Sequence, residues 1–533
     1  QSNMEMGVLS VYNADEEVAN ANYPQIRVFQ VPNSISTVPL DTLEGRWDVI
    51  SPEVMKRTNC TAAGYFFARK LNKDLNIPIG LIQTDWGGTI AEAWTSKEAL
   101  KKMPDFTKAL NELDDYNKDH GSMEYSQRLG KWWNEVDPVS NKKLGWEKPE
   151  FNDTSWKETY QPKHWDTPEL ADFDGIVWFR KNIDLPGSFA DKAAVIDLGP
   201  IDDGDTVFVN GVEVGSTMDY IEYRRYTVPA GVLKLGSNTI AIRVYDMLGP
   251  GGMWTNTPQG MTLIVGNTSV SINGDWKYKT SVSADKIKVS APASYGSNPN
   301  IPTLLYNAMV NPLIPYAIKG AIWYQGESNA GNPVQYRTLL PTMINDWRSR
   351  FGVGTFPFFI VQLANFYPVV NDPVQTGWAE LREAQSLTAA KQPKCGIAVI
   401  TDIGDAVDIH PKNKQDVGLR LAISAEAIAY GKKIEYSGPL YTKLKVEGSS
   451  IRIFFSHADG LVAKDGALKG FAIAGKDKKW VWADAKIDGK TIVVSSPSID
   501  KPAAVRYNWA NNPIGNLYNS AGLPASCFRT DFE

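Results

Sequence analysis

The chain has 533 residues, a formal net charge of −5, 43% hydrophobic residues and 22% charged residues, which is the balance of a folded protein of about two to four domains. It contains no dense run of Lys and Arg and no apolar run of about 18 residues, so a nucleic-acid partner and a membrane span are both disfavoured. The three cysteines, Cys60, Cys395 and Cys527, lie far apart and form no CxxC pair, which argues against a zinc site.

The first part of the chain shows the pattern of an α/β domain. Residues 60–75 place apolar side chains at helical spacing, 77–82 predict a short strand, and 96–116 predict a polar helix. The alternation resumes with strands predicted at 317–324, 357–364 and 396–402 and helices at 334–351, 377–390 and 413–430. Apolar strands that alternate with helices favour a parallel sheet covered on both faces, with an active site at the carboxyl ends of its strands.

Two other regions contain predicted strands but no predicted helices. In the first, Asn210-Gly211 is a hairpin signal, and strands are expected at 178–183, 206–209 and 239–245. This pattern predicts an inserted antiparallel β-sandwich. In the second, strands are expected at 451–455, 480–482 and 491–494. The predicted organisation is a catalytic domain split between 1–126 and 291–431, an insertion at 127–290 and a C-terminal β-region at 432–533.

A histidine in the right loop would supply the general base that a serine hydrolase needs. Of the four histidines, only His410 follows a predicted strand of the α/β pattern, and Asp402, Asp405 and Asp408 lie in the same loop. Asp408 is the preferred partner, because side chains at i and i+2 of an extended segment share one side and a carboxylate there would fix the imidazole tautomer. Asp405 is the second choice, and a role in loop turns is expected for at least one of the three aspartates.

Two serines compete as the nucleophile. Ser328 lies in Gly326-Glu-Ser-Asn-Ala330 after a predicted strand, which nearly matches the G-x-S-x-G elbow, and residue chemistry alone favours it. Ser2 lies in Gln1-Ser-Asn-Met4, where no strand or cap signal precedes it. A start of this kind is typical of the middle of a fold, so we expect an N-terminal piece to precede this sequence in the natural chain.

Four blocks of the sequence, in order, resemble those of the SGNH (GDSL-like) hydrolases in their sialate O-acetylesterase branch. They are Gln1-Ser-Asn-Met4, Trp86-Gly-Gly-Thr89, Trp323-Tyr-Gln-Gly-Glu-Ser-Asn329 and Asp408-Ile-His-Pro411. The resemblance implies that Ser2 is the nucleophile, with His410 as base and Asp408 as its partner.

The same resemblance implies an oxyanion hole and assigns Ser328 no catalytic role. Its donors would be the Ser2 N–H, the N–H of Gly88 or Gly87, and the side chain of Asn329. Gln325 and Glu327 would bind substrate or orient Asn329, with strand-end hydrogen bonding as the structural alternative.

The resemblance also implies a fold and an activity for the whole chain. The fold would be a three-layer SGNH, flavodoxin-like α/β domain, and the insertion would be a jelly-roll sandwich of the galactose-binding type. The activity would be a serine esterase that removes O-acetyl groups from sialic acid, secreted or periplasmic, with no cofactor or metal. Acetylated xylan or another glycan fits the same residues. A non-catalytic carbohydrate-binding protein and a glycosidase that uses Glu327 and Asp405 are the alternatives from other classes.

Two features depart from the family pattern. The glycine and the first strand that precede the nucleophile in the family are not in this sequence, so an active enzyme would take that strand from a longer precursor or a separate fragment. Many SGNH enzymes also place the aspartate three residues before the histidine, whereas Asp408 stands two before His410.

Overall fold

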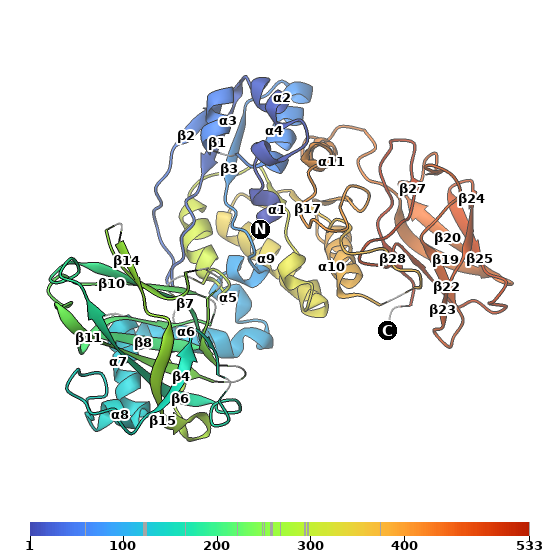
Figure 1. Ribbon diagram of the computed structural model, residues 1–533. Helices are drawn as coiled ribbons and strands as arrows, with labels where there is room; N and C mark the ends of the chain where they lie inside the picture. The colour runs from blue at the N-terminus through green and yellow to red at the C-terminus, as the bar shows by residue number, and fades with distance from the viewer. Residues whose placement is uncertain are drawn as a thin grey trace. The chain divides into compact units, whose positions relative to one another are not determined.

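The computed structural model divides into two compact units (Figure 1), Gln1–Asp115 with Tyr295–Glu533 and Tyr116–Ser294. The predicted insertion at 127–290 lies within the second unit, and the predicted C-terminal region at 432–533 belongs to the first. No helix of the described residues combines the length and apolarity needed to cross a membrane. The structure describes residues 1–58, 60–120, 125–165, 167–220, 222–247, 249, 251–255, 259–266, 268–292, 295, 298–373 and 375–531.

The α/β part of the first unit contains two short sheets with helices between their strands. Its helices are α1 (Ser2–Glu5), α2 (Ala14–Ala19), α3 (Pro52–Thr58), α4 (Ala62–Leu75), α5 (Lys97–Leu100), α6 (Thr107–His120, which continues past the division between the units), α9 (Pro333–Phe351), α10 (Gly377–Lys391) and α11 (Lys414–Ile428). Its strands are β1 (Tyr23–Gln30), β2 (Trp47–Ile50), β3 (Ile79–Gln83), β16 (Ala321–Trp323), β17 (Phe358–Val361) and β18 (Cys395–Ala398).

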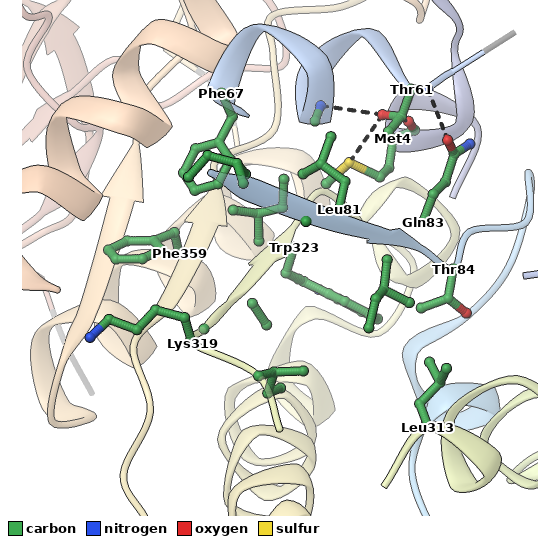
Figure 2. Close-up of a pocket in the computed structure, with 18 of the residues that line it drawn as sticks. Met4, Thr61, Phe67, Leu81, Gln83, Thr84, Leu313, Lys319, Trp323 and Phe359 are labelled. Atoms are coloured by element: carbon green, nitrogen blue, oxygen red, sulfur yellow. Dashed lines mark hydrogen bonds between the residues drawn. The ribbon is translucent and has the colours of Figure 1, made fainter. Parts of the chain in front are cut away.

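The strands of the two sheets run largely parallel. In the first sheet, of order β2-β1-β3, β1 pairs with β3 in parallel and with β2 antiparallel. In the second, of order β16-β17-β18, both pairings are parallel. Within the described residues β3 pairs only with β1, and β16 only with β17. A groove of about 420 Å³ is lined by residues of both strands, among them Leu81 of β3 and Trp323 of β16 (Figure 2). We call it the β3–β16 groove.

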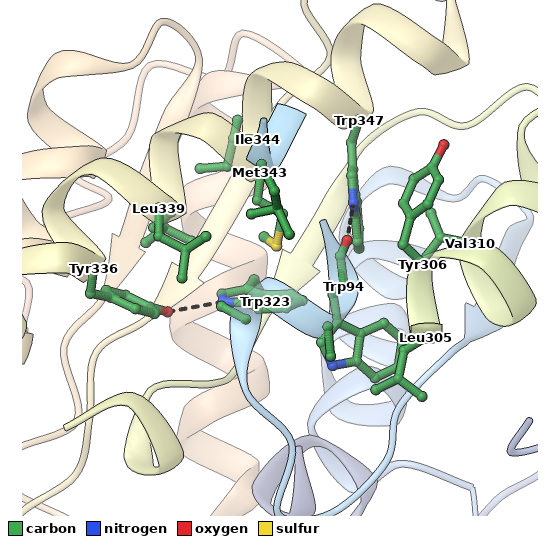
Figure 3. Close-up of a cluster of buried hydrophobic side chains, with 14 of the residues drawn as sticks. Trp94, Leu305, Tyr306, Val310, Trp323, Tyr336, Leu339, Met343, Ile344 and Trp347 are labelled. Atoms are coloured by element: carbon green, nitrogen blue, oxygen red, sulfur yellow. Dashed lines mark hydrogen bonds between the residues drawn. The ribbon is translucent and has the colours of Figure 1, made fainter. Parts of the chain in front are cut away.

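The second sheet is covered on both faces because its side chains alternate between two apolar cores. Phe358 and Ile360 of β17 pack into a core built with α9 and α10, here the α9–α10 core, part of which appears in Figure 3. Phe359 and Val361 pack on the other face into a core built with α4 and α11, the α4–α11 core. This period-two alternation into two buried layers explains why the strand reads as an uninterrupted apolar run.

Several elements differ from the sequence-based expectation. The helix expected at 96–116 is broken into α5, a 3₁₀ turn at Pro104–Phe106 and α6, because Pro104 lacks the N–H that a continuous helix would need there. The strand expected at 317–324 is only three residues long, Ala321–Trp323. The expectation missed β1, although Ile26 and Val28 alternate with polar residues in the manner of a strand and are buried.

The C-terminal strands form three antiparallel sheets joined to the α/β part through α10. The strands are β19 (Leu440–Glu447), β20 (Ser450–Ser456), β21 (Val462–Ala463), β22 (Phe471–Ala474), β23 (Trp480–Trp482), β24 (Asp484–Asp488), β25 (Thr491–Ser495), β26 (Ala504–Tyr507), β27 (Leu517–Tyr518) and β28 (Phe528–Arg529). The buried guanidinium of Arg382 on α10 donates to the carbonyl oxygens of Ala510 and Asn511, and Glu383 pairs with Arg529. Breaking such a buried ion pair on one side is costly, so these contacts hold the C-terminal strands on α10.

Among its described residues, the second unit contains two six-stranded sheets, the helices α7 (Tyr125–Val136) and α8 (Pro138–Asn141), the end of α6 and a 3₁₀ turn at Ala284–Lys286. All its strand pairs are antiparallel, and the two sheets share one apolar core. Asn210 and Gly211 both have positive φ and join β8 to β9, which confirms the predicted hairpin. Its strands are β4 (Lys157–Gln161), β5 (Lys163–His164), β6 (Gly175–Leu185), β7 (Ala194–Asp202), β8 (Gly204–Val209), β9 (Val212–Met218), β10 (Tyr223–Val228), β11 (Gly236–Asp246), β12 (Gly252–Met253), β13 (Thr262–Val265), β14 (Thr268–Ser271) and β15 (Gly274–Ser283).

Candidate active site

A serine, a histidine and an aspartate from opposite ends of the sequence meet in the first unit. Ser2 Oγ lies 2.9 Å from His410 Nε2, although 408 positions separate the two residues. On the other side of the ring, His410 Nδ1 lies 3.3 Å from Asp408 Oδ1, which also accepts the His410 backbone N–H at 2.9 Å. With Nδ1 donating to the carboxylate, Nε2 is left to accept the proton of the serine hydroxyl. This is the geometry of a nucleophile, a base and an orienting acid.

The other two aspartates of the histidine loop have different contacts. Asp405 Oδ1 accepts the backbone N–H groups of Val407 and Asp408 at 2.8 and 3.2 Å, and these bonds lower the pKa of its carboxyl. Asp402 forms a bidentate ion pair with Arg420, whose two terminal nitrogens donate to Oδ1 and Oδ2 at 2.6 and 2.7 Å. Both carboxylates therefore shape the loop, and Asp408 is the one that faces the imidazole.

Ser328, the competing nucleophile, lies beside Gln1. Its hydroxyl accepts a hydrogen bond from Gln1 Nε2 at 3.0 Å, while Gln1 Oε1 accepts the Gly326 N–H at 3.0 Å. In the part of the chain that the structure describes, no histidine is hydrogen-bonded to Ser328. The elbow-like sequence thus holds the N-terminal residue next to β16, and the geometry does not provide Ser328 with a base.

The Trp86–Thr89 turn brings a glycine against the serine. Thr89 Oγ1 donates to the Trp86 carbonyl and closes the turn. A Cβ added at Gly87 would lie 3.3 Å from Ser2 Cβ, so the backbone there approaches the serine closely. The Gly87 N–H is donated to Glu5 Oε2 at 2.6 Å, whereas Gly88 has φ +70° and a Cβ there would enter open space. Of the two glycines, Gly87 therefore already has an acceptor for its N–H in Glu5.

Asn329 is held by a buried polar network. Its Oδ1 accepts from Gln325 Nε2 at 2.6 Å and from the Ala91 N–H at 2.9 Å, and its Nδ2 donates to Glu92 Oε2 at 2.8 Å. Gln325 is only 1% exposed and its Oε1 accepts from Tyr336 Oη at 2.7 Å. These contacts favour an orienting role for Gln325 over contact with substrate. An amide nitrogen carries two N–H groups, so Asn329 can donate to Glu92 and to a second acceptor.

A second network, which the sequence did not reveal, ties the serine helix to the histidine loop. Asn3 Nδ2 donates to the Ile409 carbonyl at 2.9 Å and to Glu327 Oε1 at 2.7 Å. The buried Lys414 donates from Nζ to Asn3 Oδ1 at 2.7 Å and to the Pro411 carbonyl at 2.8 Å. The residues on both sides of His410 are thereby fixed to the residue that follows Ser2. Glu327, predicted to bind substrate or orient Asn329, accepts a hydrogen bond from Asn3 in this network.

The only signal for this network in the sequence is spacing. Asn3 directly follows Ser2, and Lys414 begins α11 four residues after His410. A lysine at the start of a helix normally reaches solvent, so its burial is decided by the packing of α11 against α4 and not by local sequence.

Replacing Lys414 with Met should alter how stability depends on pH. Burial lowers the pKa of Lys414 to about 7 from 10.5, with Glu327 acting in the opposite direction. Between these values the unfolded chain holds the extra proton, so the free energy of unfolding contributed by Lys414 rises as the pH rises from about 7 to about 10. In urea unfolding, the free energy of unfolding of the unsubstituted protein should rise relative to that of Lys414→Met across this pH range.

The exposed neighbour Lys412 provides the matched control. Lys412→Met should leave the difference from the native chain nearly constant with pH, because an exposed side chain has similar surroundings in both states. A Lys414→Met difference that stays equally flat would show that the Lys414 ammonium is not desolvated in the folded protein.

The chain is similar to known carbohydrate esterases in both sequence and structure. Residues 287–426 match the family model described as carbohydrate esterase, sialic acid-specific acetylesterase. A crystal structure of a carbohydrate acetylesterase from Xanthomonas citri is similar, with a TM-score of 0.61 and 28% sequence identity over 100% of this chain and 79% of that one.

Two curated relatives extend the comparison. The sialate O-acetylesterase of Mus musculus is 31% identical over 265 residues, 44% of this chain and 49% of the relative, so the match spans about half of the mouse protein. The sialate O-acetylesterase of Rattus norvegicus is 30% identical over 563 aligned residues, which cover 99% of this chain and 75% of that protein. The chain therefore belongs to the sialate O-acetylesterase family.

Proposed function

We propose that this protein is a serine esterase that removes O-acetyl groups from carbohydrates, with O-acetylated sialic acid as the first candidate substrate. The observation that carries the proposal is the 2.9 Å contact between Ser2 Oγ and His410 Nε2, with Asp408 on the far side of the ring. The relatives named sialate O-acetylesterase support the choice of substrate.

The proposed reaction begins with proton transfer from Ser2 Oγ to His410 Nε2, while Asp408 holds the imidazole and stabilises its charged form. Ser2 Oγ attacks the acetyl carbonyl carbon, and the carbonyl oxygen becomes an oxyanion. His410 then gives the proton to the departing sugar oxygen, which leaves an acetyl-Ser2 ester. His410 then takes a proton from water, which attacks the acetyl carbon, and returns that proton to the departing Ser2 Oγ, so that acetate is released and the free enzyme is restored.

The proposed oxyanion hole combines the Ser2 N–H, the Gly88 N–H and the second N–H of Asn329. Gly87 is the alternative to Gly88, but its N–H already serves Glu5. Burial raises the pKa of the Glu92 carboxyl, and the hydrogen bond that the Asn329 amide donates to this carboxyl acts in the opposite direction. One such donor typically lowers the activation barrier by about 3 kcal/mol, which raises the rate by roughly 10²-fold.

Acetate release from a panel of O-acetylated sugars tests the proposed function. The panel contains O-acetyl sialic acid and acetylated xylan, with p-nitrophenyl acetate as a reference ester that contains no sugar, and each is assayed with the unsubstituted chain and with Ser2→Ala. We expect Ser2-dependent acetate release, highest from O-acetyl sialic acid. A preference for xylan would shift the proposal to an acetylxylan esterase, and sugar binding without release from any substrate would favour a carbohydrate-binding protein.

Three further parts of the proposal come from the family resemblance. We propose that the α/β part has the three-layer SGNH layout, consistent with the parallel strands and the two cores described above. The second unit, with its two antiparallel sheets, would be a jelly-roll sandwich of the galactose-binding type that presents or shields a glycan. The protein would act outside the cytoplasm, as a secreted or periplasmic enzyme.

A further inference from the structure

The loop that follows β17, residues 362–373 and here called the β17 loop, lies between the loops that carry Asn329 and His410. The strands β16, β17 and β18 are parallel and adjacent in this order, so their carboxyl ends share one edge of the sheet. Asn329 follows β16, His410 follows β18, and Tyr367 follows the central strand, β17. The β17 loop is therefore placed next to both halves of the candidate active site.

Contacts on both sides of the β17 loop agree with this placement. On the histidine side, Asn365 Oδ1 accepts the Gly404 N–H at 2.6 Å, and a Cβ added at Gly404 would collide with the Asn365 carbonyl oxygen. On the other side, α10 begins just after the loop, and a Cβ added at Gly377 would lie 2.5 Å from the carbonyl oxygen of Ala330, the neighbour of Asn329. The loop and the start of α10 thus touch the segments that position the base and the oxyanion amide.

Tyr367 presents an aromatic ring at this edge of the sheet. The residue is 46% exposed, although tyrosine rings are usually largely buried. One part of the ring packs on neighbouring aromatic rings, since its centroid lies 4.2 Å from that of Phe366 and 6.0 Å from that of Trp378. The ring is therefore supported from behind and open to solvent beside the candidate active site.

The backbone of Tyr367 is held in an unusual conformation by the C-terminal region. Its φ is +71°, in the left-handed region that a bulky residue rarely adopts. Asn512 Nδ2 donates to the Tyr367 carbonyl at 2.7 Å, and Asn365 Nδ2 donates to Asn512 Oδ1 at 2.9 Å. The Phe366 N–H donates to the Asn511 carbonyl at 3.2 Å. Bulky residues fixed in this way are found preferentially at active sites and ligand contacts.

An exposed apolar surface continues from Tyr367 onto the C-terminal strands. Val369, Trp482 and Ile514 are all exposed, and they line one shallow hollow together with Asn512, the residue that holds Tyr367. Trp482 Nε1 donates to the Asn371 carbonyl at 2.5 Å, which fixes the indole on the β17 loop. We call Tyr367, Val369, Trp482 and Ile514 the β17-loop surface. Contiguous exposed apolar side chains of this kind mark binding surfaces.

A sugar ring suits the β17-loop surface better than a charged or purely apolar ligand. The faces of a sugar ring carry C–H groups, which pack against the negative face of an aromatic ring, while its hydroxyl groups point outward to water. The acetyl carbon must reach Ser2 Oγ, so the sugar that carries the ester has to lie at the same carboxyl edge of the sheet as Tyr367.

We propose that the β17-loop surface binds the carbohydrate part of the substrate, with the acetylated sugar stacked on Tyr367 and a longer glycan continuing over Val369, Trp482 and Ile514. This inference rests on the proposed function. It gives the C-terminal strands a part in substrate selection, because they hold the β17 loop and supply Trp482.

The test measures kcat and KM of variants on esters that differ only in their sugar part. The esters are O-acetyl sialic acid and O-acetyl sialyllactose, a second pair of acetylated xylose and acetylated xylotetraose, and ethyl acetate, which has no ring. The pair that the unsubstituted chain hydrolyses with the higher kcat/KM is used for the comparison of variants.

Tyr367→Ala should raise KM for both sugars of that pair by about threefold to tenfold, with kcat and the ethyl acetate kcat/KM changed less than about twofold. Tyr367→Phe keeps the ring and should retain the KM of the unsubstituted protein. Trp482→Ala should raise KM for the oligosaccharide alone. Tyr316→Ala is the matched control: it removes another exposed tyrosine, which precedes β16 at the opposite edge of the sheet, and should change none of these values.

Three results would overturn the inference. An unchanged KM for both sugars in Tyr367→Ala would remove the surface from the substrate site. An equal loss of kcat/KM on ethyl acetate and on the sugars would mean that Tyr367 only supports the catalytic loops. An unchanged oligosaccharide KM in Trp482→Ala would reject the continuation over the C-terminal strands.

Calorimetric titration with the deacetylated sugars separates this inference from the proposed function. If the unsubstituted chain releases no acetate from any ester but binds a deacetylated sugar, and Tyr367→Ala weakens that binding, the surface stands and the esterase is rejected. Acetate release that none of the substitutions alters would keep the esterase and reject the surface.

Discussion

Replacing Ser2 with Ala is expected to lower kcat/KM for p-nitrophenyl acetate by about 10³-fold or more, because the attacking oxygen is lost while the base and the oxyanion donors remain. The 2.9 Å contact to His410 makes Ser2 the serine whose proton has an acceptor. The same variant should also lose covalent labelling by a fluorophosphonate probe, which reports the nucleophile independently of turnover.

Ser328→Ala is the matched control for Ser2→Ala. Ser328 is exposed and its hydroxyl accepts only a structural hydrogen bond from Gln1 in the contacts described above, so most of the activity and all of the probe labelling should survive. If Ser328→Ala abolishes hydrolysis while Ser2→Ala leaves it, the elbow interpretation of Gly326–Ala330 is right and the Ser2 mechanism fails.

Replacing Asp408 with Asn is expected to lower kcat by about 10²-fold to 10⁴-fold with little change in KM. The neutral amide no longer stabilises the imidazolium, and an amide N–H facing Nδ1 would favour the wrong tautomer of His410. Because the Asp408 side chain is 47% exposed, water can replace part of its effect, which places the expected loss toward the lower end of the range. Steady-state rates on p-nitrophenyl acetate check this.

Asp405→Asn provides the comparison for Asp408→Asn in the same loop. An asparagine at this position keeps an Oδ1 that can accept the N–H groups of Val407 and Asp408, so the loop should hold its shape and kcat should fall by less than about tenfold. If Asp405→Asn lowers kcat more than Asp408→Asn does, with an unchanged melting temperature, then Asp405 and not Asp408 is the partner of His410.

The sequence alone predicts one residue of the candidate site, the histidine, but does not decide between the two serines. Residue type and position single out His410, since a lone histidine after an apolar strand is a local feature. The choice between Ser2 and Ser328 was not local: both are serines beside asparagines, and the near-match to a known elbow points to the serine that the structure leaves without a base. The family resemblance pointed to Ser2, and the contact with His410 agrees with it.

Other features lay outside any local pattern. The network of Asn3, Glu327 and Lys414 depends on contacts between residues more than 300 positions apart. Its members stand near Ser2 and His410 in the sequence, but this spacing does not reveal that they are bonded to one another. The β3–β16 groove is likewise invisible in the sequence, because each strand looks like an ordinary buried strand and only the arrangement of the sheets shows that two edges face each other.

The sequence by itself determined the alternation of strands and helices, the antiparallel character of the inserted unit and the single histidine in the right loop. These follow from hydrophobic period, turn residues and residue type, which act over a few neighbouring positions. Only the tertiary structure decided which serine meets His410, which aspartate supports it, and how Lys414 comes to be buried. Those outcomes depend on packing between distant segments, where desolvation and hydrogen-bond geometry, and not local propensity, set the free energy.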